Sequence, residues 1–179
     1  MKEKILALLR EEAAPVSGET LSAALGISRV SVWKHIRALQ GHGYTIEAGP
    51  KGYRLVACPD TAFPWEFPNR CDRIHYFEEI GSTMDGARAL ARNGCPGMTV
   101  VVAERQTKGR GRLDRRWLSE AGGLYFTLVL RPEIAPVHAA LLNLRCAVVL
   151  AGTIRRLYGV DARLKWPNDI LVEDRKLCG

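Results

Sequence analysis

The chain has 179 residues, of which 47% are hydrophobic and 25% are charged, a balance that excludes an intrinsically disordered chain and suits one or two domains. The formal net charge of +7 favours a polyanionic partner or a phosphorylated ligand. The five cysteines are widely spaced and lack any Cys-x-x-Cys pair, and no stretch matches a membrane span or a signal peptide. We therefore expect a cytoplasmic protein without disulfides, membrane association or a resident metal site.

Three helices are predicted in the first 41 residues. Apolar residues recur at helical spacing over 2–12, 18–25 and 29–41. Ser17 and Ser28 stand where the second and third helices would be capped, because their hydroxyls can accept from the free amides of a first turn. Two helices joined by a short glycine turn indicate a helix-turn-helix.

A basic face on the third helix and a following hairpin predict DNA binding. The alternating residues 44–55 flank a glycine-rich turn and resemble the wing of a winged helix. We expect residues 1–56 to form a winged helix-turn-helix domain. Its predicted DNA-binding residues are Ser28, Arg29, Ser31, Lys34, His35, Arg37 and Lys51. The alternative is a domain that mediates only protein contacts, with these charges solvated and with Trp33 and His35 as packing residues.

A linker is predicted at residues 57–70, which contain three prolines and no periodicity. Its aromatic residues Phe63, Trp65 and Phe67 are expected to dock on one domain, because an exposed aromatic cluster is unfavourable.

Residues 71–179 are predicted to form a second, α+β domain on a mixed sheet. Strands at 73–77, 98–104, 123–131, 162–165 and 170–172 alternate with helices at 83–93 and 136–158. In the long helix the apolar spacing indicates an inward face, which consists of Val137, Leu141, Leu144 and Val148.

Two features of this domain carry candidate chemistry. Ser82 and Thr83 lie at a strand-to-helix turn, where they either cap the helix or bind a small polar group. The segment 105–117 holds six basic residues and one acid, with glycines at 109 and 111. It is either a solvated hairpin loop that contacts RNA nonspecifically or an anion clamp that closes over a phosphate-bearing ligand.

Several stretches together resemble the biotin–protein ligases. They are Gly109-Arg-Gly-Arg112 with Trp117, Lys165-Trp-Pro-Asn-Asp169, Asp174-Arg-Lys176-Leu-Cys-Gly179, Gly81-Ser-Thr83 and Gln106. With the winged helix, the chain resembles the bacterial bifunctional form, which also represses biotin synthesis genes. The resemblance implies a class II synthetase-like ligase domain at 71–179. That domain would be C-terminally incomplete, because the family continues with further strands and a small β domain.

The resemblance also implies an activity and its partners. Biotin and Mg²⁺–ATP would give biotinyl-5′-AMP, and the biotinyl group would pass to a lysine of the biotin carboxyl carrier domain of acetyl-CoA carboxylase. The adenylate-bound protein would form a homodimer that binds operator DNA. Two alternatives stay open: a regulator that senses biotin or its adenylate without ligase activity, and a lipoate-type ligase.

Site residues follow from the matching positions. The catalytic cations would be Arg110, Arg112 and Lys176. Biotin and its adenylate would be bound by Ser82, Thr83, Met84, Gln106, Gly109, Arg110, Gly111, Arg112 and Lys176. The nucleotide would be bound by Arg115, Trp117, Lys165, Asn168 and Asp169. One departure is that Leu113-Asp114 stands where the family has Arg-Gly, which removes one donor and one glycine from the loop.

Overall fold

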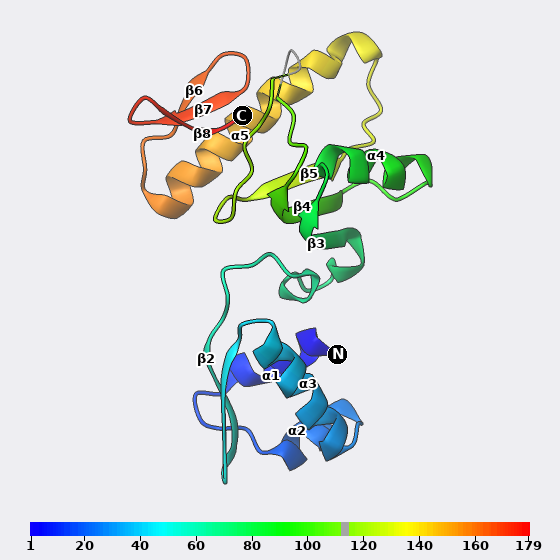
Figure 1. The fold of residues 1–179 in the computed structure, drawn as a ribbon, viewed down its shortest axis with the longest axis vertical. Helices are drawn as coiled ribbons and strands as arrows, with labels where there is room; N and C mark the ends of the chain where they lie inside the picture. Colours follow the sequence, from blue (N-terminus) through cyan, green and yellow to red (C-terminus); the bar gives the residue numbers. More distant parts are fainter. Residues whose placement is uncertain (112–114) are drawn as a thin grey trace. The chain divides into compact units, whose positions relative to one another are not determined.

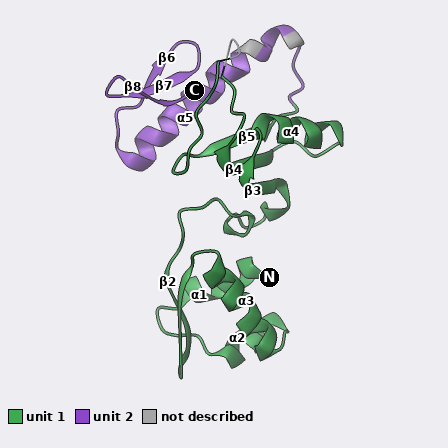
Figure 2. Cartoon of the chain, viewed as in Figure 1, with its two compact units in different colours: residues 1–131 green, residues 132–179 purple. Residues whose placement is uncertain are grey.

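The computed structural model describes residues 1–111 and 115–179, with Pro136 and Ala140 described by their backbone alone (Figure 1). The chain divides into two compact units, residues 1–131 and 132–179 (Figure 2).

The first unit begins with three helices and a hairpin. These elements are α1 (Lys2–Glu11), α2 (Gly18–Leu25), α3 (Arg29–Gly41), β1 (Thr45–Gly49) and β2 (Gly52–Ala57), and the two strands pair antiparallel. The Ser17 hydroxyl accepts a hydrogen bond from the Thr20 amide at 2.9 Å, and the Ser28 hydroxyl accepts one from the Ser31 amide at 3.2 Å. The two predicted caps are therefore confirmed.

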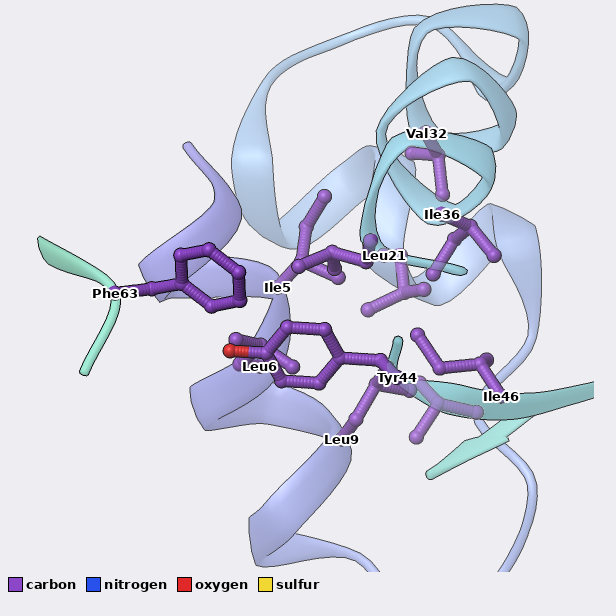
Figure 3. Packing of buried hydrophobic residues seen from close by; sticks show 11 residues of the cluster. Ile5, Leu6, Leu9, Leu21, Val32, Ile36, Tyr44, Ile46 and Phe63 are labelled. Carbon is purple, nitrogen blue, oxygen red and sulfur yellow. The ribbon is translucent and has the colours of Figure 1, made fainter. Parts of the chain in front are cut away.

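The helices enclose one apolar core (Figure 3). Its fully buried members come from one face of each helix, and each stabilises the fold by roughly 1.5–3 kcal/mol. They are Ile5, Leu6, Leu21, Val32, Ile36 and Leu39, closed by Tyr44, Ile46 and Phe63.

Much of the predicted linker is held against this core. Short 3-10 turns occupy Pro64–Glu66 and Cys71–Arg73. Phe63 is buried and stacks on Trp65 with ring centroids 4.6 Å apart, so docking is confirmed for these two aromatics. Phe67 remains 39% exposed, and the expectation that it also docks is wrong, because it follows the 3-10 turn and lies outside the stack.

A three-stranded mixed sheet follows, as the sequence predicted. It consists of β3 (Ile74–Ile80), β4 (Thr99–Gln106) and β5 (Tyr125–Val129) in the order β3-β4-β5, with β3 parallel and β5 antiparallel to β4. Helix α4 (Thr83–Arg92) covers the sheet through Ala87, which packs against Val101 and Val129. The end of β4 and the start of α4 thereby bring Gln106 and Thr83 together.

The second unit consists of a helix and a small antiparallel sheet. After a 3-10 turn at Pro136–His138 come α5 (Ala139–Tyr158), β6 (Arg163–Lys165), β7 (Asp169–Val172) and β8 (Arg175–Cys178), in sheet order β6-β7-β8. Their core contains Ala151, Ala162 and Ile170, with Leu150 and Ile154 packed against it.

The predicted inward face of this helix is wrong. Of its four members, Val137, Leu141 and Val148 are 79%, 52% and 48% exposed and only Leu144 is half-buried, whereas Ala147 and Ala151 are buried. The helix is apolar on more than one side, so periodicity alone did not select the face that packs on the sheet.

No helix in the described part of the chain is both long and apolar enough to cross a membrane.

Candidate functional site

The turn that begins α4 is capped by a side chain from a distant strand. Ser82 is the N-cap residue, but its hydroxyl makes no cap hydrogen bond. The Thr83 amide instead donates to Gln106 Oε1 at 2.8 Å. Gln106, at the end of β4, thus accepts from one of the backbone amides that the first turn of a helix leaves unpaired.

Gln106 also connects several hydroxyl groups. Thr83 Oγ1 donates to Gln106 Oε1 at 2.9 Å, and Thr127 Oγ1 donates to Thr83 Oγ1 at 3.0 Å. Gln106 Nε2 donates to Ser119 Oγ at 2.9 Å. Because Gln106 Oε1 accepts two hydrogen bonds, the side-chain amide of Gln106 has its oxygen toward Thr83 and its nitrogen toward Ser119. Each donor in the network therefore has a defined acceptor.

Among the described residues, the Ser82 hydroxyl has no hydrogen-bond partner. Its side chain is 2% exposed, and Oγ makes no hydrogen bond to any described residue. Burying an unpaired hydroxyl costs about 1–3 kcal/mol, so such a group requires an explanation. A ligand that hydrogen-bonds to Ser82 Oγ would provide it. Met84, in the same first turn of α4, is half-buried.

The basic loop is closed at its base like a hairpin. Trp117 N donates to Gly109 O at 2.9 Å, and Gly111 N donates to Arg115 O at 2.7 Å. The backbones of Arg110 and Arg116 thereby form an isolated antiparallel β-bridge. Gly109 must be glycine here, because a Cβ atom would lie 2.4 Å from the Trp117 carbonyl oxygen. Arg115 is exposed and Trp117 is half-buried. Arg112, Leu113 and Asp114 lie outside the described residues.

The loop is tied to α4 by an ion pair that the sequence did not indicate. The Arg110 guanidinium contacts the carboxylate of Asp85, in the first turn of α4 and 25 residues earlier in the chain. Arg88 lies 3.5 Å from the same carboxylate. Arg110 and Asp85 are 43% and 54% exposed, so the pair is weak and an incoming anion can compete for Arg110.

In the second unit the predicted residues gather at one end of the small sheet. Lys165 pairs in register with Asp169, and the Lys176 ammonium donates to Asp169 Oδ1 at 2.7 Å. Asn168 is half-buried, whereas Trp166 is 82% exposed. Burial raises the pKa of the nearby Cys178 thiol, which favours its neutral form.

The predicted DNA-binding residues differ in their placement. Arg29, Lys34, Arg37 and Lys51 are exposed, the first three on α3 and Lys51 at the hairpin turn. Ser28 and Ser31 bond to one another at 3.0 Å at the start of α3, and His35 is half-buried.

Sequence reasoning missed three members of the first-unit network, Asp85, Ser119 and Thr127. Each belongs to a common residue type with no distinctive spacing. Their partners lie 25, 13 and 44 residues away in the chain, so only the folded structure brings them together.

Comparison with known proteins gives two family matches. Residues 76–179 match the model of the biotin/lipoate A/B protein ligase family, and residues 2–54 match a helix-turn-helix domain. Among curated relatives, the bifunctional ligase/repressor BirA of Bacillus subtilis is 40% identical over 172 residues, which are 92% of this chain and 53% of that protein. The Escherichia coli protein of the same name is 35% identical over 168 residues, 91% of this chain and 52% of its own length. The chain thus spans about half the length of the curated relatives it matches.

Solved structures give the same family. The biotin protein ligase from Aquifex aeolicus in complex with biotin and ATP is 35% identical, with a TM-score of 0.52 over 58% of this chain and 43% of that chain. The biotin protein ligase from Leishmania major in complex with biotinyl-5-AMP is 31% identical, with a TM-score of 0.51 over 58% and 49% of the two chains.

Proposed function

Because the chain belongs to the biotin/lipoate A/B protein ligase family, we propose that it activates biotin with ATP to biotinyl-5′-AMP and transfers the biotinyl group to a carrier-protein lysine. In this proposal residues 1–56 bind operator DNA and residues 71–179 form the ligase domain. Residues 57–70 are the linker between these two domains. The carrier is the biotin carboxyl carrier domain of acetyl-CoA carboxylase, and the setting is cytoplasmic.

The single observation that carries the biotin assignment is the unpartnered Ser82 hydroxyl. Biotin's ureido ring presents one carbonyl acceptor and two N–H donors, and a serine hydroxyl can donate as well as accept. Ser82 makes no side-chain cap hydrogen bond to α4, so its hydroxyl is available to the ring. Thr83 and Gln106 hold the polar wall in one orientation, and Met84 supplies an apolar contact.

The charges suit the first reaction step. The biotin carboxylate attacks the α-phosphorus of ATP, and the bond to the departing pyrophosphate breaks. Two anions approach one another in this step, so cations must screen them. Arg110 leaves Asp85 for the ligand, Arg112 adds a second guanidinium, and Lys176 supplies a compact ammonium charge. Gly109 and Gly111 let the loop backbone approach the adenylate closely.

The nucleotide is assigned to Arg115, Trp117, Lys165, Asn168 and Asp169. Magnesium fits as the ion that enters with ATP, because Mg²⁺ in such sites is held by substrate phosphates and one or two carboxylates. Among the residues assigned to the nucleotide, Asp169 carries the carboxylate, and it pairs with Lys176.

In the second step the carrier lysine attacks the carbonyl carbon of the mixed anhydride. AMP leaves and the attacking amine loses a proton, so no covalent enzyme intermediate is needed. The chain's task is to retain the adenylate and exclude water from it. The adenylate also favours a homodimer that presents two winged helices to the operator, which requires it to bind the dimer-competent state more tightly.

The test combines calorimetry with a transfer assay. Biotin is titrated into the chain, and the chain is then incubated with biotin, ATP, magnesium and a carrier domain. We expect heat on biotin addition, pyrophosphate release and one labelled carrier lysine. Pyrophosphate release without carrier labelling would make the protein a biotin-adenylate sensor, and labelling with lipoate in place of biotin would make it a lipoate-type ligase.

A further inference from the structure

The outward face of α3 carries two large apolar residues. Val30, Trp33, Lys34 and Arg37 fall at positions i, i+3, i+4 and i+7, so they form one stripe on the helix. Val30 is 63% exposed and Trp33 is 52% exposed, whereas the core side of α3 is fully buried. Neither apolar residue packs as a core residue, and exposed apolar groups set among charges mark binding surfaces.

Val30 and Trp33 also line a groove. With Arg29 they form one side of a cleft of about 740 Å³. Its other walls are the start of α2, which contributes the acidic Glu19, and the hairpin segment that contains Pro50 and Tyr53. The hairpin is anchored, because Tyr53 and Val16 exchange two backbone hydrogen bonds of 2.8 Å. The groove is therefore present before any ligand binds.

The charge around this apolar pair indicates the occupant. Helix α3 contains Arg29, Lys34 and Arg37 and no aspartate or glutamate. Within residues 1–111 and 115–179, no ion pair neutralises any of these three cations. A second copy of this face would bring like charges together, whereas a duplex brings phosphates to the cations and base edges to the apolar pair.

We propose that Val30 and Trp33 read the 5-methyl groups of thymine in the major groove. The proposal rests on the proposed DNA-binding function and adds the chemical group that confers specificity. Thymine alone among the four bases presents a methyl group on its major-groove edge, and apolar side chains discriminate it by contact. The cations position the duplex through its phosphates and contribute no sequence preference.

The experiment removes the methyl groups without altering base pairing. The chain, with biotin and ATP present, selects duplexes from a random-sequence library. The enriched duplex is then synthesised with deoxyuridine replacing each thymine in turn. We expect an approximately fourfold higher Kd at one or more positions, which is the value of one buried methyl group. Val30→Ala or Trp33→Ala should remove this thymine preference. Val56→Ala, at a valine that is 52% exposed on β2, should retain it.

The outcomes separate the two proposals. If the library yields no enriched duplex, the DNA-binding function fails. If a duplex is enriched but deoxyuridine has no effect at any position, or weakens the Val30→Ala and Trp33→Ala variants as much as the parent, thymine reading is overturned while DNA binding stands. If these variants change self-association and leave Kd unchanged, the stripe is a contact between copies and the inference is wrong.

Discussion

Replacing Ser82 by alanine should raise stability and lower biotin affinity at the same time. The hydroxyl is 2% exposed and unpaired among the described residues, so its removal relieves a desolvation penalty of about 1–3 kcal/mol. The deleted oxygen leaves a small void that offsets part of this gain. We therefore expect the free energy of unfolding to rise by about 1 kcal/mol.

The affinity for biotin should fall, although the stability rises. The variant leaves a polar group of the ureido ring without its partner, at a cost of about 1–3 kcal/mol, which weakens binding by about 5- to 150-fold. Urea unfolding followed by tryptophan fluorescence measures the stability change, and calorimetry measures the affinity.

Ser119→Ala is the matched control. Ser119 is also buried, but its hydroxyl accepts from Gln106 Nε2, so this variant should destabilise the protein by about 1–2 kcal/mol. Ser82→Ala would refute the reasoning if it destabilised the chain, because the hydroxyl would then have a partner in the free protein. Unchanged biotin affinity would remove Ser82 from the site.

Three further predictions concern the winged helix and its attached segment. Lys34→Ala should make the negative slope of log K against log salt for DNA binding shallower by about 0.9. An unchanged slope would mean that this lysine contacts no phosphate. Glu66→Ala should destabilise the chain by about 2–3 kcal/mol in urea unfolding, because Glu66 accepts from the buried Tyr44 hydroxyl and pairs with Arg10. Arg10→Ala should cost 1 kcal/mol or less, and equal losses would show that the Tyr44 bond contributes nothing. Burial lowers the pKa of His42 below its usual 6.5, so the folded state disfavours the imidazolium, and stability should fall as pH drops below 6.5. His42→Asn should remove that part of the urea-midpoint pH profile, and an unchanged profile would assign it to another group.

Local chemistry was readable from the sequence. The serine caps of α2 and α3 depend on residues within one turn, and the alternation of strands and helices sufficed to predict a mixed sheet. The α3 cations also needed only helical spacing.

Features that depend on tertiary contact were not readable. The face of α5 that packs inward combines the buried Ala147 and Ala151 with Leu150 and Ile154, and spacing alone did not distinguish it from the other apolar sides of the helix. The Arg110–Asp85 ion pair and the Gln106–Ser119 hydrogen bond join common residue types that are far apart in the chain. The sequence does not indicate how the intervening segments fold, so it does not predict these contacts. Ser82 illustrates the same limit, because only the folded structure shows that its hydroxyl is buried and has no partner among the described residues.

The docking of Phe63 changes what the segment 57–70 can do mechanically. If it were fully extended, that stretch would span about 50 Å, and the winged-helix domain could occupy many positions relative to the sheet of β3. Phe63 instead lies in the winged-helix core, and its ring centroid is 4.8 Å from that of Tyr76 on β3. The stretch is therefore held near its midpoint by Phe63 and is not free to extend over its full length.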